Sequence, residues 1–319
     1  METDKITVTS KNRDMAGFVG VDDEYLVIPP EILAEGEFRR VETIGDEAFS
    51  ASKLNVVVLP DSVHEIRTYA FYGCRSLREV VLSNTLRTIG TVAFKGCHQL
   101  KCISIPNGVK KLGTGSFYGC TSLEVVELPD SIVEMGVDVF AFCRTIKSLR
   151  LPNGLTVIPD GMCCGCESLA SVMLPAGLEK IEPMAFYGCE SLERIDIPES
   201  VTSIGMQAFR RSGLRHVVLP GSIQRVTTET FYGCTALEKV EIMDGVEAIS
   251  SEAFAGCTSL ESIVLPGSIK NLGSKILDSC KSLKEIRYGG TRAEWKSLRY
   301  RVRLGVTDVP VNCSDGMVR

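Results

Sequence analysis

The stretch AFYGCESLERIDIPESVTSIG, residues 185–205, combines an aromatic residue, a thiol, several carboxylates and a proline. A functional site is expected once in a chain, whereas a structural unit is expected many times. This pattern recurs along most of the 319 residues, so it indicates a repeat architecture and not one isolated site.

The repeat is clearest when the chain is aligned on the aromatic position of this stretch. That position recurs every 22 or 23 residues, in an aromatic column made of Phe49, Phe71, Phe94, Phe117, Phe140, Cys163, Phe186, Phe209, Phe231, Phe254 and Leu277. Three residues further on, a thiol column holds Cys74, Cys97, Cys120, Cys143, Cys166, Cys189, Cys234, Cys257 and Cys280, with Ser212 replacing one thiol.

Each repeat predicts one coil of a solenoid. Leu192, Ile195 and Ile197, followed by Pro198, predict a short strand whose alternate side chains point inward. The proline turns the chain, and the segment that starts at Val201 forms the opposite wall. One coil cannot bury both walls, so stability requires coils stacked in register about 4.8 Å apart. The predicted fold is a β-rich solenoid of about eleven coils.

The period and the residues FYGC-SLE-V-LP-S-V--IG resemble the BspA-like bacterial leucine-rich repeats over residues 40–288. The resemblance implies a right-handed solenoid with a parallel sheet on its concave face, an extended or 3-10 convex side, and a role in binding or adhesion. YGGTRAEW (288–295) and VNCSDG (311–316) resemble the segments that close such arrays. We therefore expect an N-terminal cap with a degenerate first coil at 1–39, a solenoid at 40–288 and a C-terminal cap at 289–319, plugged by Trp295.

Composition excludes several partner classes. A net charge of -5 lacks the basic excess that nucleic acids or anionic membranes require. No apolar stretch approaches the roughly 18 residues of a membrane span, so membrane insertion is not expected. The start, METDKITVTSKNRDM, has no apolar signal region, which predicts a cytoplasmic location for a full-length chain. A secreted or cell-surface protein with its signal peptide removed is the alternative.

The chemistry-bearing residues predict structure and not catalysis. Thirteen cysteines lie mostly at one interior phase, which favours buried free thiols, although neighbouring thiols would be within disulfide range. Cys163 and Cys166 belong to the two columns, so their spacing does not indicate zinc. The histidines, His64, His98 and His216, fall at three different repeat phases. We expect no enzyme, no cofactor and no metal.

The outward positions of the predicted strands are free to encode a partner, because inward and outward side chains alternate. Two groups stand out: a valine patch of Val56, Val58 and Val81, and a charge band of Glu127, Arg150, Arg194, Asp196, His216, Lys239 and Glu241. The alternative is that these charges pair only with each other, as Glu127 with Arg150. Cys102 lies at an outward position and is the predicted accessible thiol.

These observations predict a non-catalytic recognition scaffold that binds a macromolecule through its concave strand face. A protein is the preferred class of partner. A cell-surface adhesin for a host protein or a glycan is the alternative. Neither outward column holds an aromatic residue, which disfavours a glycan, but Tyr72, Tyr118, Tyr187 and Tyr232 recur beside the aromatic column and keep that alternative open.

Overall fold

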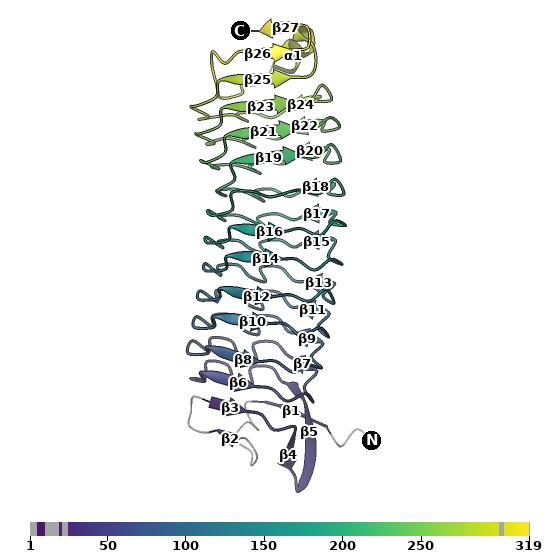
Figure 1. Ribbon diagram of the computed structural model, residues 1–319, viewed down its shortest axis with the longest axis vertical. Coiled ribbons are helices and arrows are strands. Elements are labelled where there is room, and N and C mark those ends of the chain that lie inside the picture. Colours follow the sequence, from purple (N-terminus) through teal and green to yellow (C-terminus); the bar gives the residue numbers. More distant parts are fainter. Residues whose placement is uncertain (1–4, 10–18, 21–24, 300–302, 319) are drawn as a thin grey trace. The chain divides into compact units, whose positions relative to one another are not determined.

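The computed structural model describes residues 5–9, 19–20, 25–299 and 303–318 (Figure 1). The chain divides into two compact units, Met1–Leu155 and Thr156–Arg319, here called unit 1 and unit 2. The predicted N-terminal cap lies partly outside the described residues.

Unit 1 is built almost entirely from short strands. They are β1 (Lys5–Val8), β2 (Val19–Gly20), β3 (Tyr25–Val27), β4 (Glu31–Ala34), β5 (Glu37–Ile44), β6 (Val56–Val58), β7 (Glu65–Ile66), β8 (Glu79–Val81), β9 (Thr88–Ile89), β10 (Cys102–Ser104), β11 (Lys111–Leu112), β12 (Val125–Glu127), β13 (Glu134–Met135) and β14 (Ser148–Arg150). One wall pairs β3, β6 and β8 in parallel, followed by β10 with β12. The other wall pairs β1, β5, β7, β9, β11 and β13 in parallel, and β4 adds an antiparallel hairpin to β5.

Unit 2 repeats this plan. Its elements are β15 (Val157–Ile158), β16 (Ser171–Met173), β17 (Lys180–Ile181), β18 (Ser203–Ile204), β19 (His216–Leu219), β20 (Arg225–Val226), β21 (Lys239–Ile242), β22 (Ala248–Ile249), β23 (Ser262–Leu265), β24 (Asn271–Leu272), β25 (Glu285–Tyr288), α1 (Arg292–Arg299), β26 (Val311–Cys313) and β27 (Gly316–Val318). One wall joins β19, β21, β23, β25 and β26 in parallel and ends with the antiparallel β27. The other joins β15, β17 and β18, and then β20, β22 and β24.

The two walls correspond to the two strand segments predicted in each repeat. The Leu-x-x-Ile-x-Ile segments form what we call the face strands, which are β6, β8, β10, β12 and β14 in unit 1 and β16, β19, β21, β23 and β25 in unit 2. The Val-x-x-Ile segments form the back strands. Parallel partners lie one repeat apart, as Val57 and Val80 do. The predicted β-solenoid is therefore confirmed.

The aromatic column forms the core of each unit. Phe49 through Phe140 stack ring on ring in unit 1, and Phe186 through Phe254 do so in unit 2. Neighbouring centroids lie 5.1 Å apart for Phe71 and Phe94, close to the strand spacing. In unit 2 the buried side chains of Cys163 and Leu277 take the aromatic position.

Each coil also contains left-handed backbone that the sequence pattern does not reveal. Two residues before the aromatic position, φ is positive in every coil, at Glu47, Tyr69, Val92, Gly115, Asp138, Gly161, Met184, Gln207, Glu229, Glu252 and Lys275. Two residues after it, φ is positive at Ala51, Gly73, Gly96, Gly119, Phe142, Gly165, Gly188, Arg211, Gly233, Gly256 and Ser279. These two left-handed turns form the tight connection from back strand to face strand.

The C-terminal segment of unit 2 departs from the repeat. Thr291 and Glu294 form a capping box at the start of α1, with the Thr291 N–H donating to Glu294 at 2.7 Å. Trp295 on α1 is buried, and its ring lies 5.3 Å from that of Tyr288, the last residue of β25. This contact agrees with the predicted plug, while the cap boundaries stay predictions.

Candidate binding surface

The face strands alternate between buried and exposed side chains, as the sequence predicts. Val217 and Val240 are buried, whereas His216 and Lys239 on the same strands are exposed. Arg194 and Asp196, at the outward phases of their repeat, have side chains that are 81% and 82% exposed. Ile197 differs, because it was predicted to point inward and is half-buried. It lies in a stretch, 193–197, that forms no strand.

A shortened connection accompanies this irregularity in unit 2. The coil from Phe209 has one residue fewer between its thiol column position, Ser212, and the following leucine. Gly213 fills the gap and donates its N–H to the Cys189 carbonyl at 3.1 Å. A Cβ at Gly213 would lie 2.0 Å from the Glu190 carbonyl oxygen, so only glycine fits. The face wall is irregular at this point, where 193–197 form no strand and precede β19.

A groove of about 620 Å³ opens at this irregular part of the face wall. Three members of the predicted charge band, Arg194, Asp196 and His216, line it. Val218 and Met243, both partly exposed, add apolar surface to the same groove. Met243 directly follows face strand β21 and was not among the predicted site residues.

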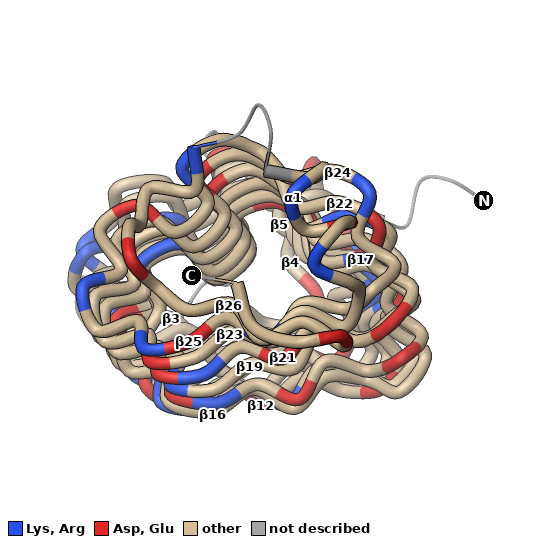
Figure 2. The backbone as a smooth tube through the Cα atoms, turned by 90° about the horizontal axis from the view of Figure 1, so that it is seen from above, with Lys and Arg blue, Asp and Glu red and all other residues tan. Residues whose placement is uncertain are grey.

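The charges in unit 2 are paired locally. Arg194 and Asp196 pair with each other along one segment, 3.1 Å apart. Glu241 accepts a bond from Lys239 of the same strand and lies 3.8 Å from His216 Nε2. The bond from Lys239 is the main reason that the pKa of Glu241 lies below its usual range. In Figure 2, Lys and Arg lie near Asp and Glu along face strands β19, β21 and β25.

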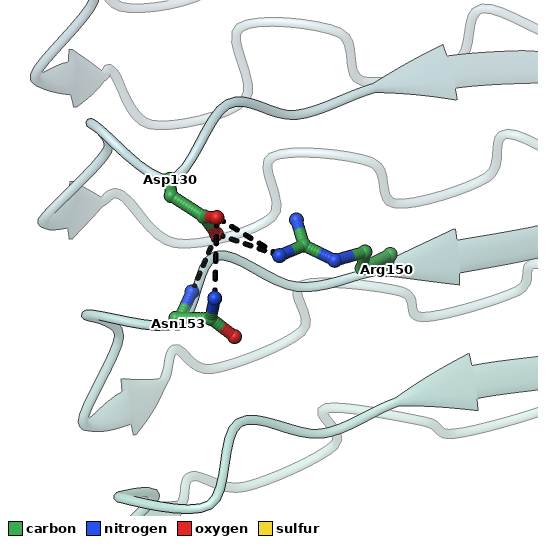
Figure 3. A network of polar contacts seen from close by, with 3 residues as sticks. All are labelled: Asp130, Arg150 and Asn153. Carbon is green, nitrogen blue, oxygen red and sulfur yellow. Dashed lines mark hydrogen bonds and ion pairs between the residues drawn. The ribbon is translucent and has the colours of Figure 1, made fainter.

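The two band residues of unit 1 do not pair with each other. Arg150 donates two hydrogen bonds to Asp130, at 3.0 and 2.9 Å, and Asp130 also accepts from the backbone and side chain of Asn153 (Figure 3). Glu127 instead accepts from Ser104 at 2.7 Å. The suggested pairing of Glu127 with Arg150 is therefore wrong, because the nearer carboxylate at the turn after β12 takes the guanidinium.

The Asp130 cluster is a feature that sequence reasoning missed. The Arg150 guanidinium is the main reason that the pKa of Asp130 lies below its usual range, and the Asn153 backbone N–H adds to the effect. Asp61 holds Asn84 in the same way, with 2.9 Å between the carboxylate and the Asn84 backbone nitrogen. Each aspartate directly follows the proline of its repeat, and each asparagine stands 23 residues later, at the same position of the next coil. This spacing of Asp and Asn could have predicted both contacts.

The valine patch continues onto the preceding strand. Val56 and Val58 are half-buried and Val81 is 45% exposed. Strand β3 pairs with β6 in register, which sets Tyr25 beside Val56 and Val27 beside Val58. Tyr25 is exposed, so strand β3 extends this apolar surface.

The cysteines follow their predicted burial. The nine thiols of the column are buried, Cys164 and Cys313 are half-buried, and Cys102 is exposed on β10. All thirteen are free thiols. Among the described residues, no group of three or more His, Cys, Asp or Glu side chains is placed to hold a metal ion.

The histidines contact groups that do not form a catalytic set. His64 lies 3.3 Å from the Thr85 carbonyl, and His98 lies 3.0 Å from the Gly119 carbonyl. His216 has the glutamate contact described above. Over residues 5–9, 19–20, 25–299 and 303–318, no helix is both long and apolar enough to span a membrane.

Comparison with known proteins agrees with this architecture. The family model described as "BspA type Leucine rich repeat region (6 copies)" matches residues 42–169 and 156–284. No curated protein matches the chain.

Solved structures are also similar to the chain. A leucine-rich repeat protein from Bacteroides ovatus superimposes with a TM-score of 0.64 at 23% identity, covering 92% of this chain and 93% of that one. A leucine-rich repeat protein of T. pallidum gives a TM-score of 0.51 at 29% identity, covering 66% of this chain and 82% of that one. Both likenesses support the repeat fold.

Proposed function

The chain belongs to the BspA-type leucine-rich repeat family, and from that premise we propose that it is a non-catalytic recognition protein whose face strands bind a protein partner. The observation that carries the proposal is the groove of unit 2, where Arg194, Asp196 and His216 surround a hollow in the face wall. A stacked, hydrogen-bonded wall needs little ordering when it binds, which lowers the entropic cost of association.

The charges of this groove are available to a partner. Arg194 and Asp196 are highly exposed and pair only weakly, since an exposed ion pair contributes about 0 to 1 kcal/mol. A partner charge can replace either member at small cost. Val218 and Met243 offer apolar contacts beside these charges. Mixed charge around an apolar centre is typical of protein interfaces.

The chemistry of the groove favours a protein over other macromolecules. Three carboxylates line it, those of Glu193, Asp196 and Glu199, against the two guanidiniums of Arg194 and Arg215, so it lacks the excess of positive charge that the phosphates of a nucleic acid require. Among the described residues, no Phe, Tyr or Trp lines it, so it lacks the stacking platform that sugar rings use. The same groove therefore favours protein recognition over glycan adhesion.

The test is a selection of displayed peptides against the native protein, followed by binding measurements on two charge-exchanged variants. Arg194→Asp with Asp196→Arg exchanges the groove charges and keeps the net charge. Glu247→Lys with Lys270→Glu is the matched control, because this pair lies on the back-strand side of the same unit. We expect the selected peptides to lose at least tenfold in affinity for the groove variant and less than twofold for the control. Equal binding to all three proteins would contradict the proposal.

A further inference from the structure

Unit 1 contains a second groove, on the connections that lead from the aromatic column to the face strands. It measures about 540 Å³ and runs across four successive coils. The side chains that matter for its chemistry are Lys53, Tyr72, Arg75, Lys95, His98 and Tyr118. No aspartate or glutamate of the described residues lines it.

The groove concentrates positive charge in a chain whose net charge is -5. Lys53 and Arg75 are exposed, and neither they nor Lys95 form an ion pair within the described part of the chain. The Lys95 ammonium lies 4.3 Å from the ring centroid of Tyr118. Uncompensated cations that gather in a groove attract an anionic ligand.

Unit 2 contains the same arrangement of a cation beside tyrosine rings, and there a carboxylate of the chain itself is bound. Arg210 stands at the repeat phase of Lys95, and its guanidinium lies 4.3 Å from the ring centroid of Tyr232 and 6.0 Å from that of Tyr187. This guanidinium binds the carboxylate of Glu229. Gln207 donates to the same carboxylate at 2.9 Å. A cation that lies between the tyrosines of the preceding and the following coil therefore binds a carboxylate in this fold.

Unit 1 lacks that carboxylate. Glu229 lies two residues before its aromatic position, with φ of 55°. The residue at that phase beside Lys95 is Gly115, whose φ is 57°. The backbone conformation is the same at both positions, but glycine has no side chain. Glu229 neutralises Arg210 in unit 2, whereas no carboxylate at this position neutralises Lys95 in unit 1.

We propose that this groove of unit 1 binds the side-chain carboxylates of an acidic peptide segment. The side chain of Glu229, bound by Arg210 in unit 2, shows that this arrangement binds a carboxylate. The cations of the unit 1 groove lie on successive coils, so they can bind several carboxylates along one peptide. The site lies in the other unit from the groove of the proposed function and does not depend on it.

The experiment measures binding of fluorescein-labelled hexaglutamate by anisotropy at about 150 mM salt, where nonspecific attraction is screened. Gly115→Glu places a carboxylate where unit 2 has one, and Gly115→Gln imposes the same backbone strain without charge. We expect Gly115→Glu to weaken binding at least tenfold and Gly115→Gln to change it less than threefold. Equal effects of the two variants would overturn the proposal.

A Cβ at Gly115 would lie 3.1 Å from Val92 Cγ1, so the Gly115 variants can fail to fold. A second pair of variants therefore tests the proposal without changing Gly115. Lys95→Gln with Arg75→Gln removes two groove cations, and Lys110→Gln with Lys101→Gln removes two exposed cations outside the groove lining. We expect only the groove variant to lose hexaglutamate. Hexagalacturonate is the competing probe, and its binding as tightly as hexaglutamate would assign the site to acidic glycans and overturn the peptide proposal. Absence of hexaglutamate binding to the native protein would overturn it as well.

Discussion

The thiol of Cys234 donates to the backbone carbonyl oxygen of Phe209, one coil earlier, over 3.0 Å. The same contact recurs along the thiol column, for example from Cys97 to Phe71 and from Cys257 to Phe231. A small side chain with one weak donor fits this interior position, because it fills space and satisfies a carbonyl. Ser212 stands at one position of this column, and its hydroxyl lies 3.3 Å from Cys234 Sγ.

The thiol column predicts that the protein loses stability at alkaline pH. Burial raises the pKa of Cys234 to about 11 and that of Cys280 to about 12. An unfolded cysteine has a pKa of about 8.5, so above that pH the thiol loses its proton in the unfolded state but keeps it in the folded state. Deprotonation therefore stabilises the unfolded state as the pH rises. This contribution is complete below about pH 8.5 and is lost as the pH rises toward 11.

Urea unfolding at intervals from pH 7.5 to 10.5 tests this prediction. Each such thiol adds a slope of about 1.4 kcal/mol per pH unit within its window. Cys234→Ser removes one titrating group and keeps a hydrogen-bond donor, so we expect its stability to fall less steeply than that of the native protein. A native free energy of unfolding that stays flat over this range would contradict the burial of the column.

Thiol labelling is predicted to separate Cys102 from the column. Cys102 is exposed, whereas the nine column thiols are buried. A small maleimide should label Cys102 first on the native protein, followed slowly by the half-buried Cys164 and Cys313. All thirteen should react after unfolding, as read by intact mass. Cys102→Ser should abolish the first phase, and rapid labelling that persists in this variant would show that the column opens.

Most of the fold follows from the sequence because the core positions recur with one period. The columns of Phe186 and Cys189 are dictated by stacking of identical coils, and eleven copies make the pattern unambiguous. The left-handed turns were not predicted, because non-glycine residues such as Glu229 and Lys275 occupy one of the two positions. There the hydrogen bonds between coils impose a backbone that local propensity does not favour.

The surface was less predictable than the core. The repeat phase correctly predicted that Arg194 and Asp196 point outward, although their segment forms no strand, but it does not say which charges pair. Arg150 pairs with Asp130, which lies in the turn after β12. Asn153 also binds this carboxylate and orients it. The groove beside Val218 lies next to the short connection at Gly213, where the packing of the backbone between coils cannot be read from the repeat pattern.

The face and core positions of unit 2 are predicted to respond differently to truncation. Arg194→Ala with Asp196→Ala removes only an exposed pair and should change the free energy of unfolding by less than about 1 kcal/mol. Phe186→Ala removes a buried ring that stacks 5.5 Å from Phe209 and should cost about 3 to 5 kcal/mol. Thermal and urea unfolding compare the two variants, and a large loss from the exposed pair would show that these side chains support the core.

Glycine at a left-handed position is predicted to stabilise unit 2. Arg211 has φ of 56°, where most other coils have glycine, and a non-glycine residue there costs roughly 1 to 2 kcal/mol. Its side chain is exposed, so Arg211→Gly should raise the free energy of unfolding by about 1 kcal/mol. The reciprocal change, Gly233→Ala, introduces a Cβ at φ of 68° and should lower stability by a similar amount. Urea unfolding of both variants measures the difference, and shifts of the same sign would mean that side-chain contacts at these positions outweigh backbone strain.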